Sequence, residues 1–360
     1  MITKAAIRAE GHRLQQRFEA AGGMPVDADI LQPADILLDL YGEDIRGRAY
    51  VTSDPLRGEL MLRPDFTVPI VQMHMKDGAE PARYTYSGEV FRRQETDSQR
   101  PSESIQVGYE VFDRDDPIAA DAEVFSLFQK ILSGLDLRAV TGDIGIVMAA
   151  IKSLNTTDRR KAALFRHVWR PERFLTLLQR FGGRVPVPAT RAALLANPDP
   201  IDATVPLVGL RSVEEIGARI TALHEDAAEP FIAPKEADML DEILKLKASL
   251  PDACAQLNRI AKNVPVLQSA VDLLNKRTEA LGARGVDVST LEFEGSYGRI
   301  AMEYYDGFVF GFESKSDEDL PPVASGGRYD AMTRVLGQGA AIPAVGGVIR
   351  PERVIAEQEA

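Results

Sequence analysis

The stretch that decides the fold is residues 83–112, RYTYSGEVFRRQETDSQRPSESIQVGYEVF. Both of its ends, residues 83–91 and 104–112, are rich in the β-branched and aromatic side chains that favour strands. The polar segment between them, residues 92–103, is too long for a tight hairpin turn, which is typical of a functional or mobile loop. We therefore predict an antiparallel strand pair joined by a long polar loop.

Helical and strand patterns alternate irregularly around this pair. Thr3 is a suitable N-cap for a first helix that ends near Gly22. The run 35–44 fits a strand or a short helix, and the run 59–75, ELMLRPDFTVPIVQMHM, joins an apolar strand to a helix through Pro64 and Thr67. Residues 116–135 have an amphipathic helical pattern.

The middle of the chain differs from both ends. Residues 144–288 are mostly helical in pattern, and the strand pattern returns after residue 290 in LEFEGSYGRIAMEYYDGFVFGFES. Mixed runs of strands and helices favour an antiparallel α+β domain over an alternating parallel fold. We expect an antiparallel sheet flanked by helices, built from residues 1–143 and 289–360, with residues 144–288 as a mostly helical insertion.

Composition excludes several classes of protein. The 360 residues include 42 Lys and Arg against 54 Asp and Glu, a formal net charge of -12, which argues against a general binder of nucleic-acid backbones. Cys254 stands alone and cannot form an intrachain disulfide. The charged N-terminal segment does not fit a signal peptide, and no apolar run reaches the roughly 18 residues of a membrane span. We expect a cytoplasmic protein without a membrane role.

Polar side chains gather on the predicted strand pair and beside it. Asp65 and Thr67 flank the strand-to-helix turn, and strand periodicity places Gln106, Gly108 and Glu110 on one face. A solvated sheet surface explains such a face as well as a pocket does. If it is a pocket floor, Gly108 would leave room for a ligand to approach the backbone.

Other candidate groups give weaker signals. In an extended MEYYDGF run, Tyr304 and Tyr305 would point to opposite faces, so at most one of them would face such a pocket. SGGRYD, residues 325–330, fits either an ordinary turn or an anion-binding nest. The four histidines lack metal-ligand spacing, so we expect neither a metal site nor a cofactor; they are His12, His74, His167 and His224.

Five segments, in order, resemble motifs of class II aminoacyl-tRNA synthetases, and within that class those of histidyl-tRNA synthetase. They are LRPDFT (62–67), similar to an Arg-Pro-Glu-Gly-Thr turn; YSGEVFRRQ (86–94) with QVGYEVF (106–112), similar to motif 2; IAMEYYDGFVF (300–310), similar to the histidine-specific segment; SGGRYD (325–330), similar to a Gly-Gly-Arg-Tyr-Asp turn; and AVGGVIRPERV (344–354), similar to motif 3.

The resemblance implies roles for the matching residues. Asp65, Thr67 and Gln106 would hold the α-amino end of a bound amino acid, while Glu110 and Tyr305 would recognise an imidazole ring. Arg92 and Arg353 match the motif 2 and motif 3 arginines that grip ATP phosphates in the synthetases. The histidine-binding set that the resemblance implies is Asp65, Thr67, Arg92, Gln106, Glu110, Tyr304 and Tyr305.

The sequence departs from the synthetase pattern at positions that, in the family, take part in activating the amino acid with ATP. Ile300 stands where the family has an arginine that contacts the reacting carboxylate and phosphate, and Arg299 in a strand would point to the other face. Gln94 replaces a motif 2 acidic residue, the usual loop phenylalanine is absent near Ser104, and Arg350 replaces the motif 3 glycine beside the adenine site. The resemblance therefore implies no catalytic residues.

The chain ends seven residues after Arg353, so we also expect no anticodon-binding domain. Together these features resemble the family of ATP phosphoribosyltransferase regulatory subunits. The resemblance implies a non-catalytic subunit for the first step of histidine biosynthesis, with a homodimeric core in a hetero-oligomer. It would bind histidine and transmit feedback inhibition to a short catalytic subunit. A truncated histidine-activating enzyme and a scaffold with a vestigial pocket are the alternatives.

Overall fold

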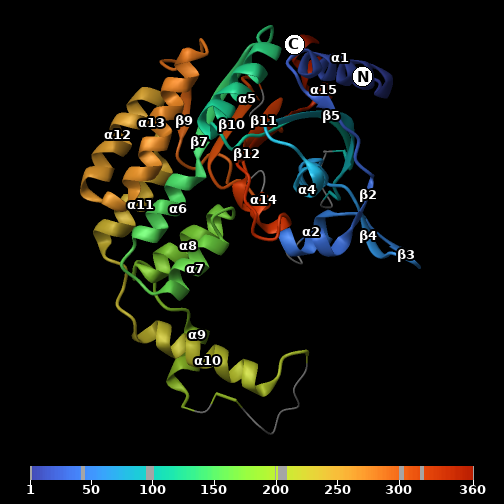
Figure 1. The fold of residues 1–360 in the computed structure, drawn as a ribbon. Helices are drawn as coiled ribbons and strands as arrows, with labels where there is room; N and C mark the ends of the chain where they lie inside the picture. The colour runs from blue at the N-terminus through green and yellow to red at the C-terminus, as the bar shows by residue number, and fades with distance from the viewer. Residues whose placement is uncertain are drawn as a thin grey trace. The chain divides into compact units, whose positions relative to one another are not determined.

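A computed structural model of the protein describes residues 2–41, 45–94, 101–198, 200–201, 209–299, 304–316 and 320–359. Ile300 and most of the predicted loop after Gln94 lie outside the described residues. The chain divides into two compact units (Figure 1). The first contains residues 1–149 and 243–360, and the second contains residues 150–242.

A nine-stranded sheet forms the centre of the first unit, in the order β1-β5-β6-β12-β11-β10-β7-β9-β8. Neighbouring strands are antiparallel except for the pairs β1–β5 and β7–β9. The strands are β1 (Met24–Pro25), β5 (Ala82–Phe91), β6 (Glu103–Phe112), β7 (Leu137–Asp143), β8 (Lys247–Ser249), β9 (Glu292–Glu294), β10 (Phe308–Ser314), β11 (Ala324–Arg328) and β12 (Ala344–Ile349). A smaller sheet has the order β2-β4-β3, from β2 (Leu31–Pro33), β3 (Val51–Asp54) and β4 (Gly58–Leu62).

Helices of the first unit pack around the two sheets, with α2 (Ala34–Tyr41) against the smaller one. They are α1 (Lys4–Ala20), α2 (Ala34–Tyr41), α3 (Ile45–Arg48), α4 (Thr67–Asp77), α5 (Pro117–Ile131), α12 (Leu250–Asn263), α13 (Gln268–Ala283), α14 (Asp330–Leu336) and α15 (Pro351–Glu359), with α6 (Ile144–Ser153) and α11 (Pro234–Lys245) crossing the unit boundaries. The side chain of Thr3 accepts a hydrogen bond from the Ala6 N–H and so caps α1, as expected. Asp116 caps α5 in the same way through Ala119.

The two faces of the sheet differ in character. On one face, Phe18 of α1 stacks on Tyr109 with ring centroids 5.3 Å apart, and Phe128 of α5 packs against Phe310 at 5.5 Å. The opposite face carries Gln106 and Glu110, because side chains alternate along β6. α4 and α14 lie side by side near that opposite face (Figure 1). One face is thus an apolar core, and the other carries buried polar groups.

The predicted α+β fold is confirmed, and so is the antiparallel pair β5–β6, in which Tyr86 lies opposite Gly108. Two local predictions are wrong. The segment SGGRYD does not form a turn or nest, because its first four residues belong to strand β11, paired on both sides. The run around MEYYDGF is not one extended strand either, since Tyr304 lies in a turn before β10 begins at Phe308.

The second unit is helical. It contains α7 (Asp158–Arg166), α8 (Pro171–Phe181), α9 (Ala189–Ala196) and α10 (Val213–Ala228), together with parts of α6 and α11. Phe174, Leu178 and Phe181 are buried along one side of α8. Arg160 is also buried, and it is held by Asp226 at 2.6 Å and by the carbonyl of Pro230. This pair ties α7 to the end of α10.

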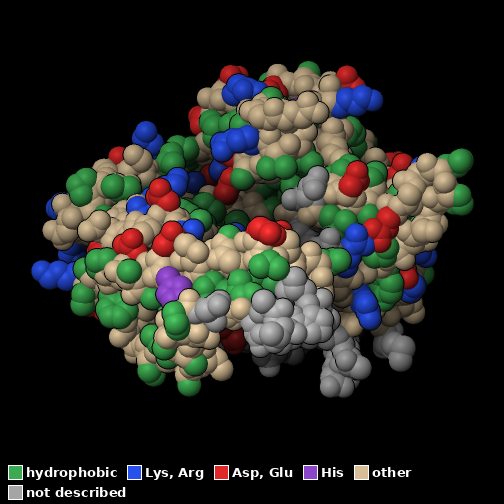
Figure 2. Space-filling model, turned by 90° about the horizontal axis from the view of Figure 1, so that it is seen from below, with side chains coloured by type: hydrophobic (Ala, Val, Ile, Leu, Met, Phe, Trp, Pro, Cys, Tyr) green, Lys and Arg blue, Asp and Glu red, His purple; other side chains and the backbone are tan. Residues whose placement is uncertain are grey.

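Figure 2 shows acidic and basic side chains interspersed over the face in view. Across the described residues, every helix is too short or too polar to cross a bilayer.

Candidate functional site

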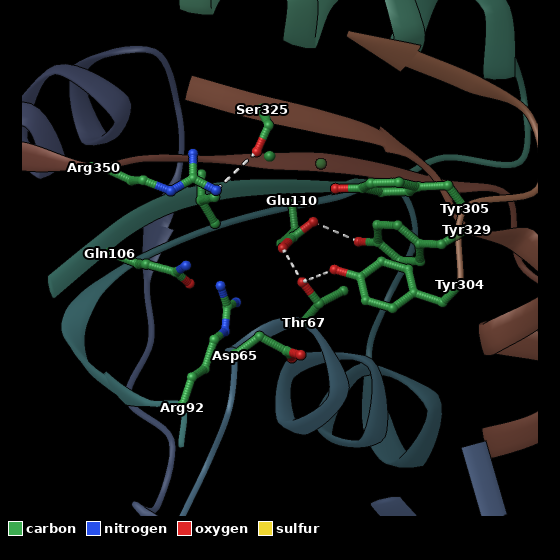
Figure 3. A pocket seen from close by; sticks show the side chains of 13 residues that line it. Asp65, Thr67, Arg92, Gln106, Glu110, Tyr304, Tyr305, Ser325, Tyr329 and Arg350 are labelled. Carbon is green, nitrogen blue, oxygen red and sulfur yellow. Dashed lines mark hydrogen bonds between the residues drawn. The ribbon is translucent and has the colours of Figure 1, made fainter. Parts of the chain in front are cut away.

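A small polar cavity lies on the polar face of the large sheet (Figure 3). Its floor comes from β6, β11 and β12, and its sides come from the turn before α4, the end of β5 and the segment before β10. The open space is about 20 Å³, close to the room that one water molecule needs. The lining residues are Asp65, Thr67, Arg92, Gln106, Glu110, Tyr304, Tyr305, Ser325, Tyr329, Gly346, Gly347, Val348 and Arg350.

Glu110 defines one end of the cavity. Its Oε1 accepts hydrogen bonds from the hydroxyls of Thr67 and Tyr86, both at 3.1 Å, and its Oε2 accepts one from Tyr329 at 2.6 Å. An ionised carboxylate has about four acceptor positions, so one acceptor position remains beside Oε2. A side chain at Gly346, on the neighbouring strand, would collide with this carboxylate. The glycine therefore makes the room in which Glu110 lies.

The electrostatics of this end are unusual. Burial raises the pKa of Glu110 to about 7, although the hydroxyls of Tyr329, Tyr86 and Thr67 favour its ionised form. Burial also raises the pKa of Tyr305 far above its ordinary range, with the charge of Glu110 adding to the effect. Near neutral pH the cavity thus holds a neutral phenol beside a carboxyl group that gains or loses its proton easily.

The role predicted for Gly108 is wrong. The space that its missing side chain leaves is filled by the ring of Tyr86, which lies opposite it in the strand pair. Tyr86 uses that space to reach Glu110 with its hydroxyl, and its ring stacks on Phe66 at 4.3 Å. The glycine admits a protein side chain to the pocket floor, and a ligand has no access to the backbone there.

The turn before α4 brings its polar groups to the cavity. The guanidinium of Arg63 lies 3.8 Å from the centroid of the Phe66 ring, and its Nε donates to the carbonyl of Glu89 at 2.8 Å. Asp65 accepts a weak hydrogen bond of 3.3 Å from the N–H of Val68 in the first turn of α4. Thr67 is the first residue of α4 and is fixed by its bond to Glu110. The turn therefore presents a carboxylate and a hydroxyl together.

The other end of the cavity carries positive charge. Arg92 follows directly after β5, and its Nε donates to the carbonyl of Pro64 at 2.9 Å. Arg350 follows directly after β12 and donates to the carbonyl of Pro322 and to the Ser325 hydroxyl. Gln106 lies near both arginines in Figure 3, across the cavity from the tyrosines. The cavity is thus polarised, with a carboxyl and phenols at one end and two guanidiniums at the other.

All seven residues of the expected histidine-binding set line this one cavity. The prediction that at most one of the paired tyrosines would face it is wrong, because the chain turns at Tyr304 and both tyrosines line the cavity. Arg353 is outside the lining and pairs with Glu357 at 3.1 Å within α15. Arg299 lies in a turn where a strand was expected, and burial lowers its pKa to about 10.

Sequence reasoning missed three polar side chains of the lining: Tyr329, Ser325 and Arg350, the last of which was considered only as a departure from motif 3. Ser325 and Tyr329 belong to the segment SGGRYD, whose paired glycines predict a turn and whose hydroxyl groups carry no such pattern. In strand β11, Ser325 and Gly327 face the cavity side, and Tyr305 packs over Gly327. Strand alternation within SGGRYD was the available signal for Ser325, while Tyr329 follows the strand and reaches Glu110 from the start of α14.

Comparison with known proteins places this geometry in a family. A family model described as histidyl-tRNA synthetase matches residues 3–197 and 217–354. The ATP phosphoribosyltransferase regulatory subunit of Brucella canis is 30% identical over 349 residues, covering 91% of this chain and 92% of that protein. The protein with the same description from Agrobacterium fabrum is 32% identical over 363 residues, covering 95% and 94%.

Solved structures share the fold at lower identity. An ATP phosphoribosyltransferase regulatory subunit/histidyl-tRNA synthetase from Bacillus halodurans has a TM-score of 0.67 at 19% identity, covering 98% of this chain and 79% of that one. A histidyl-tRNA synthetase from Nostoc sp. PCC 7120 has a TM-score of 0.67 at 17% identity, covering 99% and 72%. With the curated relatives, these matches show that the chain belongs to the family of histidyl-tRNA synthetase-like ATP phosphoribosyltransferase regulatory subunits.

Proposed function

We propose that this chain is a non-catalytic subunit that binds histidine and transmits feedback inhibition to a short ATP phosphoribosyltransferase catalytic subunit. The names of its curated relatives support the regulatory role. The observation that carries the ligand assignment is the polarised cavity, in which a carboxyl and phenols face two guanidiniums across a small enclosed space. Free histidine has the same polarity, with an imidazole at one end and charged groups at the other.

The Glu110 end suits an imidazole ring. A carboxylate accepts a hydrogen bond from one ring N–H, and a phenol such as Tyr305 can bond the second nitrogen. Apolar amino acids of similar size would leave these buried groups without partners, which costs about 1–3 kcal/mol for each group. This end therefore favours histidine over leucine or methionine.

The α-amino group has two suitable acceptors. Asp65 supplies a carboxylate beside Thr67, and Gln106 supplies an amide oxygen. Gln106 is only 2% exposed, and its Oε1 has no hydrogen-bond partner among the described residues. A buried acceptor without a partner is costly, and an ammonium group in the cavity would satisfy it.

Binding requires the cavity to open, which offers a route to regulation. A space of about 20 Å³ does not hold an amino acid, so lining side chains must move when histidine enters. A ligand that selects an open state shifts the population toward it, and a partner that contacts the moving segments feels the shift. Typical couplings of this kind are about 1–3 kcal/mol, and they are reciprocal between the ligands.

The direct test is titration calorimetry of the isolated chain with L-histidine, followed by co-purification with a short catalytic subunit. We expect binding of histidine by this chain, and phosphoribosyl transfer by the complex that histidine inhibits. Absence of binding to the isolated chain and to the complex would refute the sensor role. Histidine-dependent ATP–pyrophosphate exchange by the chain alone would instead identify the truncated activating enzyme, which the isoleucine at position 300 disfavours.

The proposal includes a homodimeric core. Apolar side chains are exposed on β1 and around the small sheet, where Met24, Ile30, Val51 and Leu56 are 42–96% exposed. A contiguous exposed apolar patch is typical of protein interfaces, and we propose that these residues contribute to one. Sedimentation analysis of the chain alone should therefore give about twice the monomer mass of 39.4 kDa. A monomer at micromolar concentration would contradict this part of the proposal.

A further inference from the structure

Arg350 occupies a defined position in the cavity. It is the first residue after strand β12, and its backbone N–H donates to the carbonyl of Val323 at 2.9 Å. Its guanidinium donates to the carbonyl of Pro322 at 2.7 Å and to Ser325 Oγ at 3.2 Å. Two bonds on different nitrogens, with the backbone fixed, hold the side chain in one orientation. The guanidinium is therefore a built part of the lining.

A second positive charge lies near it. Burial lowers the pKa of Arg350 to about 10, and the neighbouring charge of Arg92 adds to this effect. Tyr305, Tyr297 and Glu352 act in the opposite direction but more weakly. Within the described ranges, neither guanidinium has an Asp or Glu oxygen within 4 Å. Two like charges that form no direct ion pair favour an anion in the space between them.

Gln106 completes the arrangement. Its side chain lies close to both arginines in Figure 3, and its Oε1 is the buried acceptor without a partner in the described part of the chain. A group that places an anion against the arginines and a donor against Gln106 satisfies all three side chains. The α-carboxylate and α-ammonium of an amino acid are separated by one carbon atom, so one zwitterion provides both.

We propose that Arg350, together with Arg92, binds the α-carboxylate of the amino acid that occupies this cavity. This assignment rests on the proposed histidine-binding function and extends it to the carboxylate end. The cavity contains two carboxyl side chains and two guanidiniums, and a zwitterionic ligand adds no net charge to it. Arg350 thus supplies a positive charge that the isoleucine at position 300 cannot supply.

The competing interpretation is purely structural. In it, Arg350 ties β11 to the end of β12 through Ser325 and Pro322, and its charge faces no ligand. The two interpretations differ in what they predict for a ligand without a carboxylate. A structural arginine affects all ligands alike, whereas a carboxylate anchor affects only those that carry the carboxylate.

The experiment compares L-histidine with L-histidinol, in which an alcohol replaces the carboxylate, by titration calorimetry on the full chain. The unmodified protein should bind histidine about 10- to 100-fold more tightly, because hydrogen bonds to charged groups contribute about 1.5–3 kcal/mol. In Arg350→Gln, histidine affinity should fall toward that of histidinol, while histidinol affinity stays unchanged. Arg350→Lys, which keeps the charge, should recover part of the loss.

The controls separate the possible failures. Arg57→Gln removes the same charge from an exposed site on the β3–β4 hairpin and should leave both affinities unchanged. If the unmodified chain binds histidine but does not prefer it over histidinol, the carboxylate assignment is overturned even if Arg350→Gln fails to fold. Equal loss of both ligands in a folded Arg350→Gln overturns it too. If the unmodified chain binds neither ligand, the proposed function itself fails.

Discussion

Two clusters of buried and half-buried charged groups lie in the first unit of this protein, and they differ in how completely their members are paired. One is the ion-pair cluster of Asp121, Asp143, Arg277 and Arg328. The other is the cavity that contains Glu110, Arg92 and Arg350. Both take charge out of water, which costs several kcal/mol for each ion unless partners compensate. The comparison separates charges that hold the fold from charges that are available to a ligand.

In the ion-pair cluster, each guanidinium donates hydrogen bonds directly to carboxylate oxygens. Arg277 of α13 donates to Asp121 and to Asp143, both at 2.7 Å. Arg328 of β11 donates to Asp121 at 2.6 Å and to Asp330 at 2.9 Å. The cluster joins α5, α13, β7 and β11, and it carries as many negative as positive side chains. No ligand is needed to satisfy it.

In the cavity the pairing is incomplete at one end. Glu110 receives three hydroxyl donors, yet among the described residues neither guanidinium of the cavity forms an ion pair, and the Gln106 oxygen has no hydrogen-bond partner. Incompletely paired polar groups destabilise a fold, so a protein that keeps them gains something else by them. Pairing therefore distinguishes the two clusters, although both contain buried carboxyl groups.

The largest effect should come from breaking the ion-pair cluster. Asp121→Ala leaves two buried guanidiniums short of their shared partner, and the free energy of unfolding should fall by about 3–5 kcal/mol. Urea denaturation measures it, with Asp136→Ala as control, because Asp136 pairs with Lys315 at an exposed site and should change stability by about 0.5 kcal/mol or less. Similar losses in the two variants would remove the structural role of the cluster.

The second effect concerns pH and tests the cavity. The folded pKa of Glu110, about 7, lies above its ordinary 4.5, so the folded state holds this proton more strongly than the unfolded state. Its contribution to stability is fully present below pH 4.5 and is lost as pH rises through about 7, by up to about 3 kcal/mol. Unfolding free energies of the unmodified chain and Glu110→Gln should diverge over this range.

The difference between the two proteins isolates Glu110 from other groups. Asp306, whose pKa burial raises to about 6, contributes with the same sign in both proteins and cancels. Parallel stability curves between pH 4.5 and pH 7 would show that Glu110 is already ionised in the folded chain. The Glu110 end of the cavity would then resemble the ion-pair cluster, in which the carboxylates are ionised and fully paired.

The third effect is on ligand affinity. Glu110→Gln replaces one acceptor oxygen by an NH2 group that cannot accept the imidazole N–H, so histidine affinity should fall about 10- to 100-fold by calorimetry. Glu123→Gln is the matched control, because Glu123 also accepts a tyrosine hydroxyl, that of Tyr109, at 3.1 Å, and pairs with Arg83 on the opposite face of the sheet. Equal weakening in both variants would mean that the loss comes from the fold.

Part of this site was predictable because it depends on local pattern. Alternation along one strand placed Gln106 and Glu110 on the same face, and the proline-containing turn placed Asp65 and Thr67 beside them. Arg92 follows at the end of the paired strand. The strand pair, the first helix and the α+β class are likewise local or compositional features.

The rest depends on contacts between segments far apart in the chain. The Tyr86 ring fills the space that the missing side chain of Gly108 leaves, and this can be known only once the strand pairing places Tyr86 opposite Gly108. Tyr329 is 219 positions from Glu110 in the sequence. Its hydroxyl reaches the carboxylate because the sheet order places β11, which precedes Tyr329, only one strand away from β6. The turn at Tyr304 overrides the strand propensity of two adjacent tyrosines. Propensity could not reveal any of these three arrangements.

The smallest effect sharpens the comparison within the cavity itself. Tyr305 is buried and its phenol is neutral. Its hydroxyl can therefore form one hydrogen bond without charge to an imidazole nitrogen, which contributes about 0.5–1.5 kcal/mol. Tyr305→Phe should therefore weaken histidine binding about 2- to 10-fold by calorimetry. Tyr304→Phe is the comparison, because its hydroxyl lies 3.4 Å from Thr67 Oγ1, at the outer limit of a hydrogen bond, and should contribute less. If Tyr304→Phe weakens histidine binding more than Tyr305→Phe does, Tyr304 is the residue that bonds the imidazole. The second ring nitrogen then points toward α4 and away from the sheet.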